Sequence, residues 1–319
     1  MALRTSFTNL MSIAHPIASA PMGGEAGGAL AAAVSNGGGL GLIGAGRGDR
    51  DWLTREAGIA RKSTANPWGI GFLVWAIDPD AVAFALEFQP AAIVLSFGDP
   101  QPFARRVHDS EAELILQVTD LDEARRAVDV GADIIVAQGS DAGGHCGEHG
   151  LGTMSFVTAV VDLAGSTPVL AAGGIGDGRG LAAALTLGAA GALIGTRFQA
   201  TPEALVSAEI VKALLDADGE DTEVNRTLDI ARGSAWPHRY PARTLRNEVL
   251  ERWRDRDDEL RSDTATLAEY IDAAARGDLS VAPVWAGQGV GLVTSVDSAE
   301  DIVRRIVDEA EQALDRITR

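Results

Sequence analysis

The sequence predicts an α/β fold: a (β/α)8 TIM barrel with a smaller helical insertion or lid domain. Short apolar runs bounded by Gly, Pro or Asp alternate with amphipathic segments through the first two-thirds of the chain. Eight such units, spaced about 25 residues apart, match the repeat of a (β/α)8 barrel. Glycine-rich loops follow many of the runs instead of only the first, which favours the barrel over a doubly wound open sheet.

The apolar runs predict eight strands, and the segments between them predict outer helices. The predicted strands are residues 17–20, 40–43, 69–74, 92–96, 113–118, 133–137, 168–171 and 192–195. The predicted helices are residues 25–35, 50–62, 79–88, 101–108, 120–130, 155–164 and 177–188. Since each run is short and continuously apolar, we expect buried parallel strands.

The pattern changes after Thr201, where the chain becomes rich in charge. Residues 202–282 contain no convincing strand pattern and predict helices, with Trp236, Trp253 and Tyr270 available to anchor them. We therefore expect a helical lid or insertion over this range.

The last part of the chain returns to the barrel. Residues 284–292 are followed by a predicted last barrel helix over 298–317, for which Ser298 has N-cap chemistry. The predicted domains are thus the barrel, residues 1–201 and 283–319, and the lid, residues 202–282.

Bulk composition excludes several classes of protein. The net charge is −18, from 45 acidic and 27 basic residues, which disfavours nucleic acid and anionic membranes as partners. The N-terminus has no signal-peptide pattern, and no apolar run reaches about 18 residues. A lone cysteine, Cys146, precludes an intrachain disulfide. We expect a soluble, cytoplasmic protein, and a homodimer is compatible with the sequence.

The loops after the seventh and eighth strands predict a phosphate site. Residues 171–176 read Ala-Ala-Gly-Gly-Ile-Gly, and residues 195–198 read Gly-Thr-Arg-Phe. In barrels these two loops commonly bind phosphate through backbone N–H groups and a helix N-terminus. The candidate residues are Ala172, Gly173, Gly174, Gly195 and Thr196. The alternative is a pair of tight barrel turns without a ligand.

The loop after the sixth strand carries the candidate catalytic residue. Residues 138–145 read Gln-Gly-Ser-Asp-Ala-Gly-Gly-His. The amide of Gln138 is suited to hydrogen-bond a flavin ring, and Gly143 and Gly144 leave room for a planar group. His145 has a pKa naturally near neutrality, which suits it to remove a proton next to an electron-withdrawing group.

Other functions of this loop stay open. His145 alone is compatible with a turn cap, and Cys146 beside it with a Cys–His nucleophile pair. Asp141, His145, Cys146 and His149 are a conceivable metal set, but no further ligands complete it, so we expect no metal.

The loop after the first strand adds Ala20, Pro21 and Met22. Met22 is placed to lie against a planar cofactor while the neighbouring backbone hydrogen-bonds the ring edge. A Pro-Gly turn that packs methionine into the core is the alternative.

Taken together, these motifs resemble the nitronate monooxygenase family, also called 2-nitropropane dioxygenases. The resemblance runs through residues 20–24, 138–145, 168–175 and 191–198, and residues 286–289 (Ala-Gly-Gln-Gly) extend it. It implies FMN with its phosphate at Gly173, Gly174, Gly195 and Thr196, its ring near Met22, Gln138 and Gly143, and Gln288 as a further cofactor contact. The third strand departs from the family, since Gly71 stands where an amide side chain is common.

The resemblance also implies an activity. It is FMN-dependent oxidation of alkyl nitronates or nitroalkanes by O2 with release of nitrite, in which His145 is the general base. The Gly-Gly-His segment is shared with FMN-dependent enoyl-thioester reductases, so an NAD(P)H-dependent enoyl-thioester reductase is the alternative. A non-enzymatic flavin-binding partner or sensor is a third hypothesis.

Overall fold

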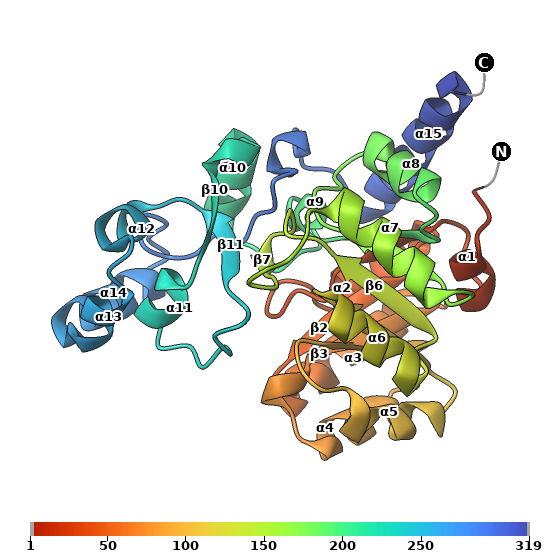
Figure 1. Cartoon of the computed structure of the whole chain (residues 1–319), viewed down its shortest axis with the longest axis horizontal. Helices are drawn as coiled ribbons and strands as arrows, with labels where there is room; N and C mark the ends of the chain where they lie inside the picture. The colour runs from red at the N-terminus through yellow and green to blue at the C-terminus, as the bar shows by residue number, and fades with distance from the viewer. Residues whose placement is uncertain (1–2, 318–319) are drawn as a thin grey trace.

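A computed structural model describes residues 3–317 and confirms the barrel (Figure 1). Its parallel strands lie in the order β1-β9-β8-β6-β5-β4-β3-β2. The sheet closes where Ala18 bridges Leu40, and the Ser19 N–H donates to the Leu40 carbonyl at 3.0 Å. The ends of the predicted barrel domain, residues 1–2 and 318–319, lie outside the described residues.

Every predicted strand and helix of the barrel is present, with its ends within three residues of the prediction. The strands are β1 (Ile17–Ser19), β2 (Gly41–Gly46), β3 (Trp68–Leu73), β4 (Ala92–Ser96), β5 (Glu113–Val118), β6 (Ile134–Gln138), β8 (Val169–Ala172) and β9 (Gly191–Ile194). The intervening helices are α2 (Gly28–Asn36), α3 (Arg50–Ser63), α4 (Pro79–Leu86), α5 (Gln101–His108), α6 (Leu121–Val130), α7 (Thr153–Ala164) and α8 (Gly178–Thr186). The last helix, α15 (Ala299–Ile317), packs on α8 and α2 and completes the ring.

Aspartates start several of the barrel helices. Asp49, Asp78, Asp120 and Asp177 each precede a helix and accept a hydrogen bond from an N–H of its first turn. These caps satisfy backbone donors that have no partner within the helix.

The barrel interior is filled by small and branched side chains such as Leu42, Val94, Ile115 and Leu170. Phe7, from the N-terminal helix α1 (Ser6–Met11), belongs to the same buried cluster. The interior is therefore a packed core, as barrels of this size have, and the functional site falls to the loops at the carboxyl ends of the strands.

The lid, residues 202–282, is not wholly helical, so the prediction that it lacks strands is wrong. Strands β10 (Thr222–Asn225) and β11 (Ala242–Leu245) pair antiparallel, and β11 also pairs with β7 (Gly144–His145) from the barrel loop. Thr-Glu-Val-Asn and Ala-Arg-Thr-Leu have little of the apolar alternation that marks a strand. The second partner of β11, strand β7, lies far away in the sequence.

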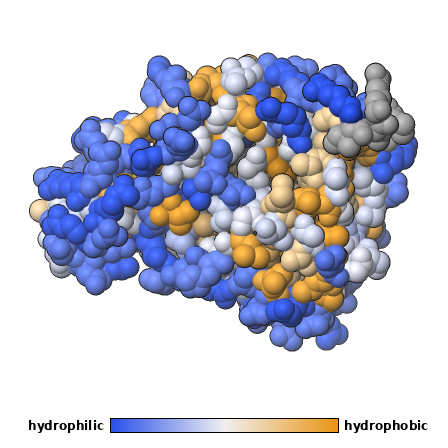
Figure 2. Space-filling view, turned by 45° about the horizontal axis from the view of Figure 1, so that its top comes forward, coloured by the Kyte–Doolittle hydropathy of each residue, from blue (hydrophilic) through white to orange (hydrophobic). Residues whose placement is uncertain are grey.

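Helices of the lid enclose a small core of their own, and these are α11 (Thr227–Ala231), α12 (Glu248–Trp253), α13 (Asp257–Ser262) and α14 (Thr264–Ala275). Trp253 and Tyr270 lie in that core, as predicted, whereas Trp236 does not. Helix α10 (Ala208–Asp216) packs elsewhere, with its Leu214 in a cluster with Val284, Ala286 and Val290. Figure 2 shows that the lid, at its left, presents mainly hydrophilic residues to solvent on this face. Within residues 3–317, no helix has the length and apolarity needed to cross a bilayer.

Candidate active site

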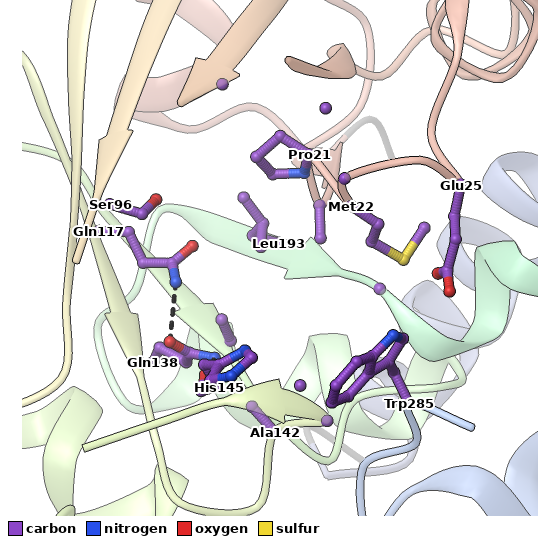
Figure 3. A pocket seen from close by; sticks show the side chains of 18 of the residues that line it. Pro21, Met22, Glu25, Ser96, Gln117, Gln138, Ala142, His145, Leu193 and Trp285 are labelled. Carbon is purple, nitrogen blue, oxygen red and sulfur yellow. Dashed lines mark hydrogen bonds between the residues drawn. The ribbon is translucent and has the colours of Figure 1, made fainter. Parts of the chain in front are cut away.

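A cavity of about 520 Å³ opens at the carboxyl ends of the barrel strands, and lid residues complete its wall. It brings together nearly all the side chains and loops predicted from the sequence. Those that line it are Ala20, Pro21, Met22, Gln138, Gly143, Gly144, His145, Ala172, Gly173, Gly174, Gly195 and Thr196. Figure 3 shows Pro21, Met22 and Leu193 across the cavity from Gln138 and His145.

Gln288 is the exception among the predicted cofactor residues. Its neighbours Gly287 and Gly289 line the cavity, but Gln288 is exposed and does not. Its N–H donates to the Asp141 carbonyl at 2.9 Å, so its backbone ties this segment to the loop before His145. The side chain of Gln288 is thus exposed and outside the cavity lining, and its contact with the cofactor stays a prediction.

The two glycine-rich loops leave backbone donors free at one end of the cavity. Gly173 and Gly174 have φ angles of 111° and 71°, a region that favours glycine. Among the described residues, the N–H groups of Gly174, Gly195 and Thr196 have no protein acceptor. Convergent free N–H groups at a loop are the chemistry that binds a phosphate.

The nearby start of helix α8 does not take part in this set. Asp177 accepts from the N–H groups of Arg179 and Gly180, and Glu309 accepts from that of Gly178 at 2.9 Å. The N-terminus of α8 is thus already satisfied by carboxylates. The free N–H of Thr196 lies at another helix start, since Thr196 begins the short helix α9 (Thr196–Gln199). Thr196 accepts from the Gly287 N–H through its hydroxyl at 3.1 Å and keeps its own O–H to donate.

Pro21 and Met22 form the wall opposite His145. A Cβ on Gly71 would lie 2.4 Å from the Pro21 side chain, so glycine at this position in β3 gives the proline its room. A Cβ on Gly195 would lie 3.7 Å from the Met22 sulfur, which places the thioether beside the eighth-strand loop. Gly71, which itself lines the cavity, is therefore explained by its packing against Pro21.

Both polar atoms of the Gln138 amide make hydrogen bonds within the protein. Its Nε2 donates to the His145 carbonyl at 3.0 Å, and its Oε1 accepts from Gln117 at 2.7 Å (Figure 3). The side chain thus holds the backbone of the catalytic loop. One N–H and one lone pair are left for a ligand.

His145 lies in the cavity wall on strand β7, with 8% of its side chain exposed. Its Nε2 lies 2.9 Å from Oδ2 of Asp229, and the indole of Trp236 stacks on its ring with a centroid distance of 3.4 Å and an interplanar angle of 10°. Burial lowers the pKa of the imidazole from its ordinary value, against the opposing effect of Asp229. His145 is therefore neutral at pH 7, the form that accepts a proton.

Asp229 is held in turn by Arg232. The Arg232 Nε donates to Oδ1 of Asp229 at 3.0 Å, while Oδ2 is the oxygen that faces His145. Burial acts to raise the pKa of Asp229, but the hydrogen bonds from His145 and Arg232, together with the positive charge of Arg232, outweigh it and lower that pKa. The carboxylate is therefore ionised at neutral pH and serves only as an acceptor.

The comparisons with known proteins agree with this geometry. The model of the nitronate monooxygenase family matches residues 4–82 and 76–309. The chain belongs to this family. It is 30% identical to a probable nitronate monooxygenase of Staphylococcus saprophyticus over 99% of this chain and 100% of that protein.

Solved structures with the same fold include FabK and a nitroalkane oxidase. FabK from Thermotoga maritima has a TM-score of 0.87 and 31% identity, covering 99% of this chain and 98% of that one. The nitroalkane oxidase from Streptomyces ansochromogenes has a TM-score of 0.82 and 29% identity, covering 98% of this chain and 100% of that one. The chain is thus an oxidoreductase of the nitronate monooxygenase family.

Nitronate monooxygenases are flavoproteins, and the cavity of this family member fits a flavin. Free N–H groups at Gly174, Gly195 and Thr196 suit a phosphate. Pro21, Met22 and other apolar residues provide a surface for a planar ring. The donor set and the apolar wall therefore suit the two ends of such a cofactor.

The sequence did not reveal the lid residues that line this cavity or contact His145. Asp229, Arg232 and Trp236 come from the lid, and Trp285 from the segment that follows it. Asp229 and Arg232 are two charges among many, so nothing local distinguishes them. Trp236 could have been suspected from the sequence, because the proline that follows it argues against a place in a packed helix.

Glu25 is a further carboxyl that the sequence did not single out. It lines the cavity (Figure 3), and burial raises its pKa to about 7. A change of its charge near neutral pH would alter the field inside the cavity.

Cys146 lies outside the cavity lining. Its thiol is buried, its Sγ donates to the Pro241 carbonyl at 3.5 Å, and burial raises its pKa. A buried, protonated thiol is not an activated nucleophile, so the Cys–His pair is not supported. Over the described part of the chain, no group of three or more His, Cys, Asp or Glu side chains is placed to hold a metal ion.

Proposed function

We propose that this protein binds FMN and oxidises alkyl nitronates and nitroalkanes with O2, releasing nitrite, with His145 as the general base. The observation that supports it best is the neutral imidazole in the cavity wall, held by Asp229 at 2.9 Å. The membership of the nitronate monooxygenase family supports the substrate class.

The chain's own residues have separate tasks in this mechanism. The N–H groups of Gly174, Gly195 and Thr196 bind the FMN phosphate, and Pro21 and Met22 pack on its ring. Bound FMN supplies an electron acceptor that O2 can reoxidise. The imidazole of His145 removes the proton α to the nitro group of a neutral nitroalkane.

We also propose that residues 202–282 act as a lid domain. They place Arg232 and Trp236 in the cavity wall, and β11 ties them to the catalytic loop through its pairing with β7. Trp236 contacts Trp75 and Phe97 with ring centroids 5.0 and 5.1 Å apart. This aromatic wall suits the alkyl chain of a substrate and limits the access of water.

The direct test is nitrite release. Purified, FMN-loaded protein is incubated aerobically with several short alkyl nitronates and neutral nitroalkanes, and nitrite is measured. We expect turnover of both, and absence of nitrite from every nitronate would refute the proposal. His145→Ala should lose activity on neutral nitroalkanes and keep FMN. The matched control is His108→Ala, which changes an exposed histidine at the end of α5.

A second candidate is NAD(P)H-dependent reduction of an enoyl thioester. It is supported by the likeness to FabK, whose TM-score of 0.87 exceeds that of the nitroalkane oxidase at 0.82. Anaerobic mixing of the FMN-loaded protein with NADH or NADPH separates the two. Rapid bleaching of the flavin by either nucleotide supports the reductase, and a flavin that only nitronates bleach supports the oxidase.

A further inference from the structure

The carboxylate of Asp229 connects the lid to the catalytic histidine. Asp229 lies on α11 and is 84 residues from His145 in the sequence, and both side chains are almost fully buried. Its two oxygens have different partners: Oδ2 faces Nε2 of His145, and Oδ1 accepts from Arg232. Arg232 therefore fixes which oxygen is presented to the imidazole.

This contact decides which ring nitrogen of His145 carries the proton. An ionised carboxylate accepts hydrogen bonds and donates none, so Nε2 of His145 must be the N–H that donates to Asp229. In a neutral imidazole the other nitrogen, Nδ1, then carries the basic lone pair. Within the described residues, Nδ1 has no hydrogen-bond partner. It is also not completely buried, so a ligand can reach it.

The remaining freedom of the ring is restricted by its neighbours. The indole of Trp236 covers one face of the imidazole at 3.4 Å, and Gln138 holds the backbone carbonyl of His145 at 3.0 Å. The orientation of the ring and its tautomer are thus both set by side chains, of which Asp229 and Trp236 belong to the lid.

We propose that Asp229 is a positioning residue that makes Nδ1 of His145 the catalytic base, so that the lid supplies the group that sets the tautomer of the base. The inference rests on the proposed function. In the proton transfer, the C–H bond α to the nitro group breaks, and an N–H bond forms at Nδ1. The electron pair moves into the nitro group and gives the nitronate. Asp229 stabilises the imidazolium, and Nδ1 later releases its proton to water.

Asp229→Asn tests the role of the carboxylate. Arg232 needs an acceptor, so it selects the amide oxygen of the new side chain and turns the amide NH2 toward Nε2 of His145. The NH2 donates to Nε2 and moves the ring proton to Nδ1, where it blocks the base. Asparagine in place of a catalytic aspartate inverts a histidine tautomer in serine proteases in the same way.

The readout is the ratio of activity on a neutral nitroalkane to activity on its preformed nitronate, which needs no proton abstraction. We expect kcat/KM for the nitroalkane, relative to the nitronate, to fall about 100-fold in Asp229→Asn. The control is Glu223→Gln, which removes a lid carboxylate that pairs with Arg254 outside the cavity, and its ratio should match the wild type. An equal loss on both substrates would make Asp229 merely structural and overturn the inference.

A second measurement does not depend on activity. ¹⁵N NMR of histidine-labelled protein reports the tautomer of each of the five histidines, and His145→Ala identifies the signal of His145. We expect the Nε2–H tautomer in the wild type and a shift toward Nδ1–H in Asp229→Asn. An Nδ1–H tautomer in the wild type would overturn the inference even if the variant fails to fold.

The two hypotheses fail in different ways. A wild-type protein that gives no nitrite from nitronates refutes the proposed function, and the tautomer of His145 still decides the role of Asp229. A wild-type protein that turns over both substrates, with an unchanged ratio in Asp229→Asn, refutes the role of Asp229 alone.

Discussion

At the scale of the residue, His145 shows how a common side chain acquires the fixed orientation that the proposed base requires. Its backbone carbonyl is held by Gln138, its Nε2 by Asp229 and one ring face by Trp236. Each contact removes a degree of freedom that an imidazole on a glycine-rich loop would otherwise have. The loop supplies the histidine, and its neighbours supply the orientation that proton transfer needs.

The protonation of His145 leads to a prediction about pH. Burial is the main cause that lowers its pKa below the ordinary 6.5, with Asp229 opposing and Arg232 adding to the decrease. Because the base works in its neutral form, protonation of His145 should lower kcat/KM for a neutral nitroalkane only below pH 6.5, and a smaller change centred near pH 7 would come from Glu25. A pH profile of kcat/KM from about 5 to 8 checks this. A loss of most of kcat/KM with a midpoint above pH 7 would contradict a lowered pKa of His145.

At the scale of the element, the glycines of the barrel serve two purposes. Some give a loop its backbone conformation, as Gly173 and Gly174 do beside the cavity. Others let two elements approach closely, and Gly28 is the clearest case. A Cβ on Gly28 in α2 would lie 2.0 Å from the Glu56 carbonyl in α3, so these helices meet backbone to backbone.

The same substitution in two neighbouring helices should therefore have opposite effects. Gly28→Ala forces α2 and α3 apart and should lower the free energy of unfolding by about 2 kcal/mol. Gly58→Ala in α3 meets no atom within 4 Å and should raise it by about 1 kcal/mol, because alanine favours the helix. Urea unfolding of both variants measures the difference. Equal stability of the two would show that the close contact does not matter.

At the scale of the whole molecule, ion pairs join parts that are distant in the chain. Arg197 follows the eighth barrel strand, is 5% exposed and pairs with Asp297 at 3.0 Å, just before the last helix. Arg305 on α15 binds the same carboxylate at 3.0 Å. The C-terminal segment is thereby fixed to the loop that carries Gly195 and Thr196, so this part of the cavity wall depends on the closing helix.

Asp297→Asn should destabilise the protein in a pH-dependent way. Hydrogen bonds from Arg305 and Ser295 hold the pKa of Asp297 at about 2, below its ordinary 3.8. The stabilisation is fully present above about pH 4 and is lost as pH falls through about 2. At pH 7 the free energy of unfolding of the variant should be about 2 kcal/mol lower than that of the wild type, because the substitution removes the charge that pairs with buried Arg197.

Chemical unfolding of wild type and Asp297→Asn at a series of pH values measures this difference. The difference in the free energy of unfolding between the two proteins should be constant from neutral pH to about 4 and should become smaller in stronger acid. A gap that widens with acid would contradict the assignment. The exposed pair of Lys212 with Asp216 offers a control, since Asp216→Asn should change stability little at any pH.

The sequence by itself determined the barrel and most of the cavity wall. Local patterns of apolar and turn-forming residues predict the strands, the helices between them and the glycine loops at 171–176 and 195–198. Because a (β/α)8 barrel brings all the carboxyl ends of its strands to one face, a list of the loops is already a list of candidate site residues. His145, Gln138 and Met22 were found in this way.

Only the tertiary structure decided which residues complete the site. Strands β10 and β11 exist through pairing with each other and with β7, and polar four-residue strands leave little local trace. Asp229 reaches His145 across 84 residues, and Gln288 turns away from a cavity that its neighbours line. Contacts of this kind depend on the relative placement of lid and barrel, which no local pattern of residues encodes.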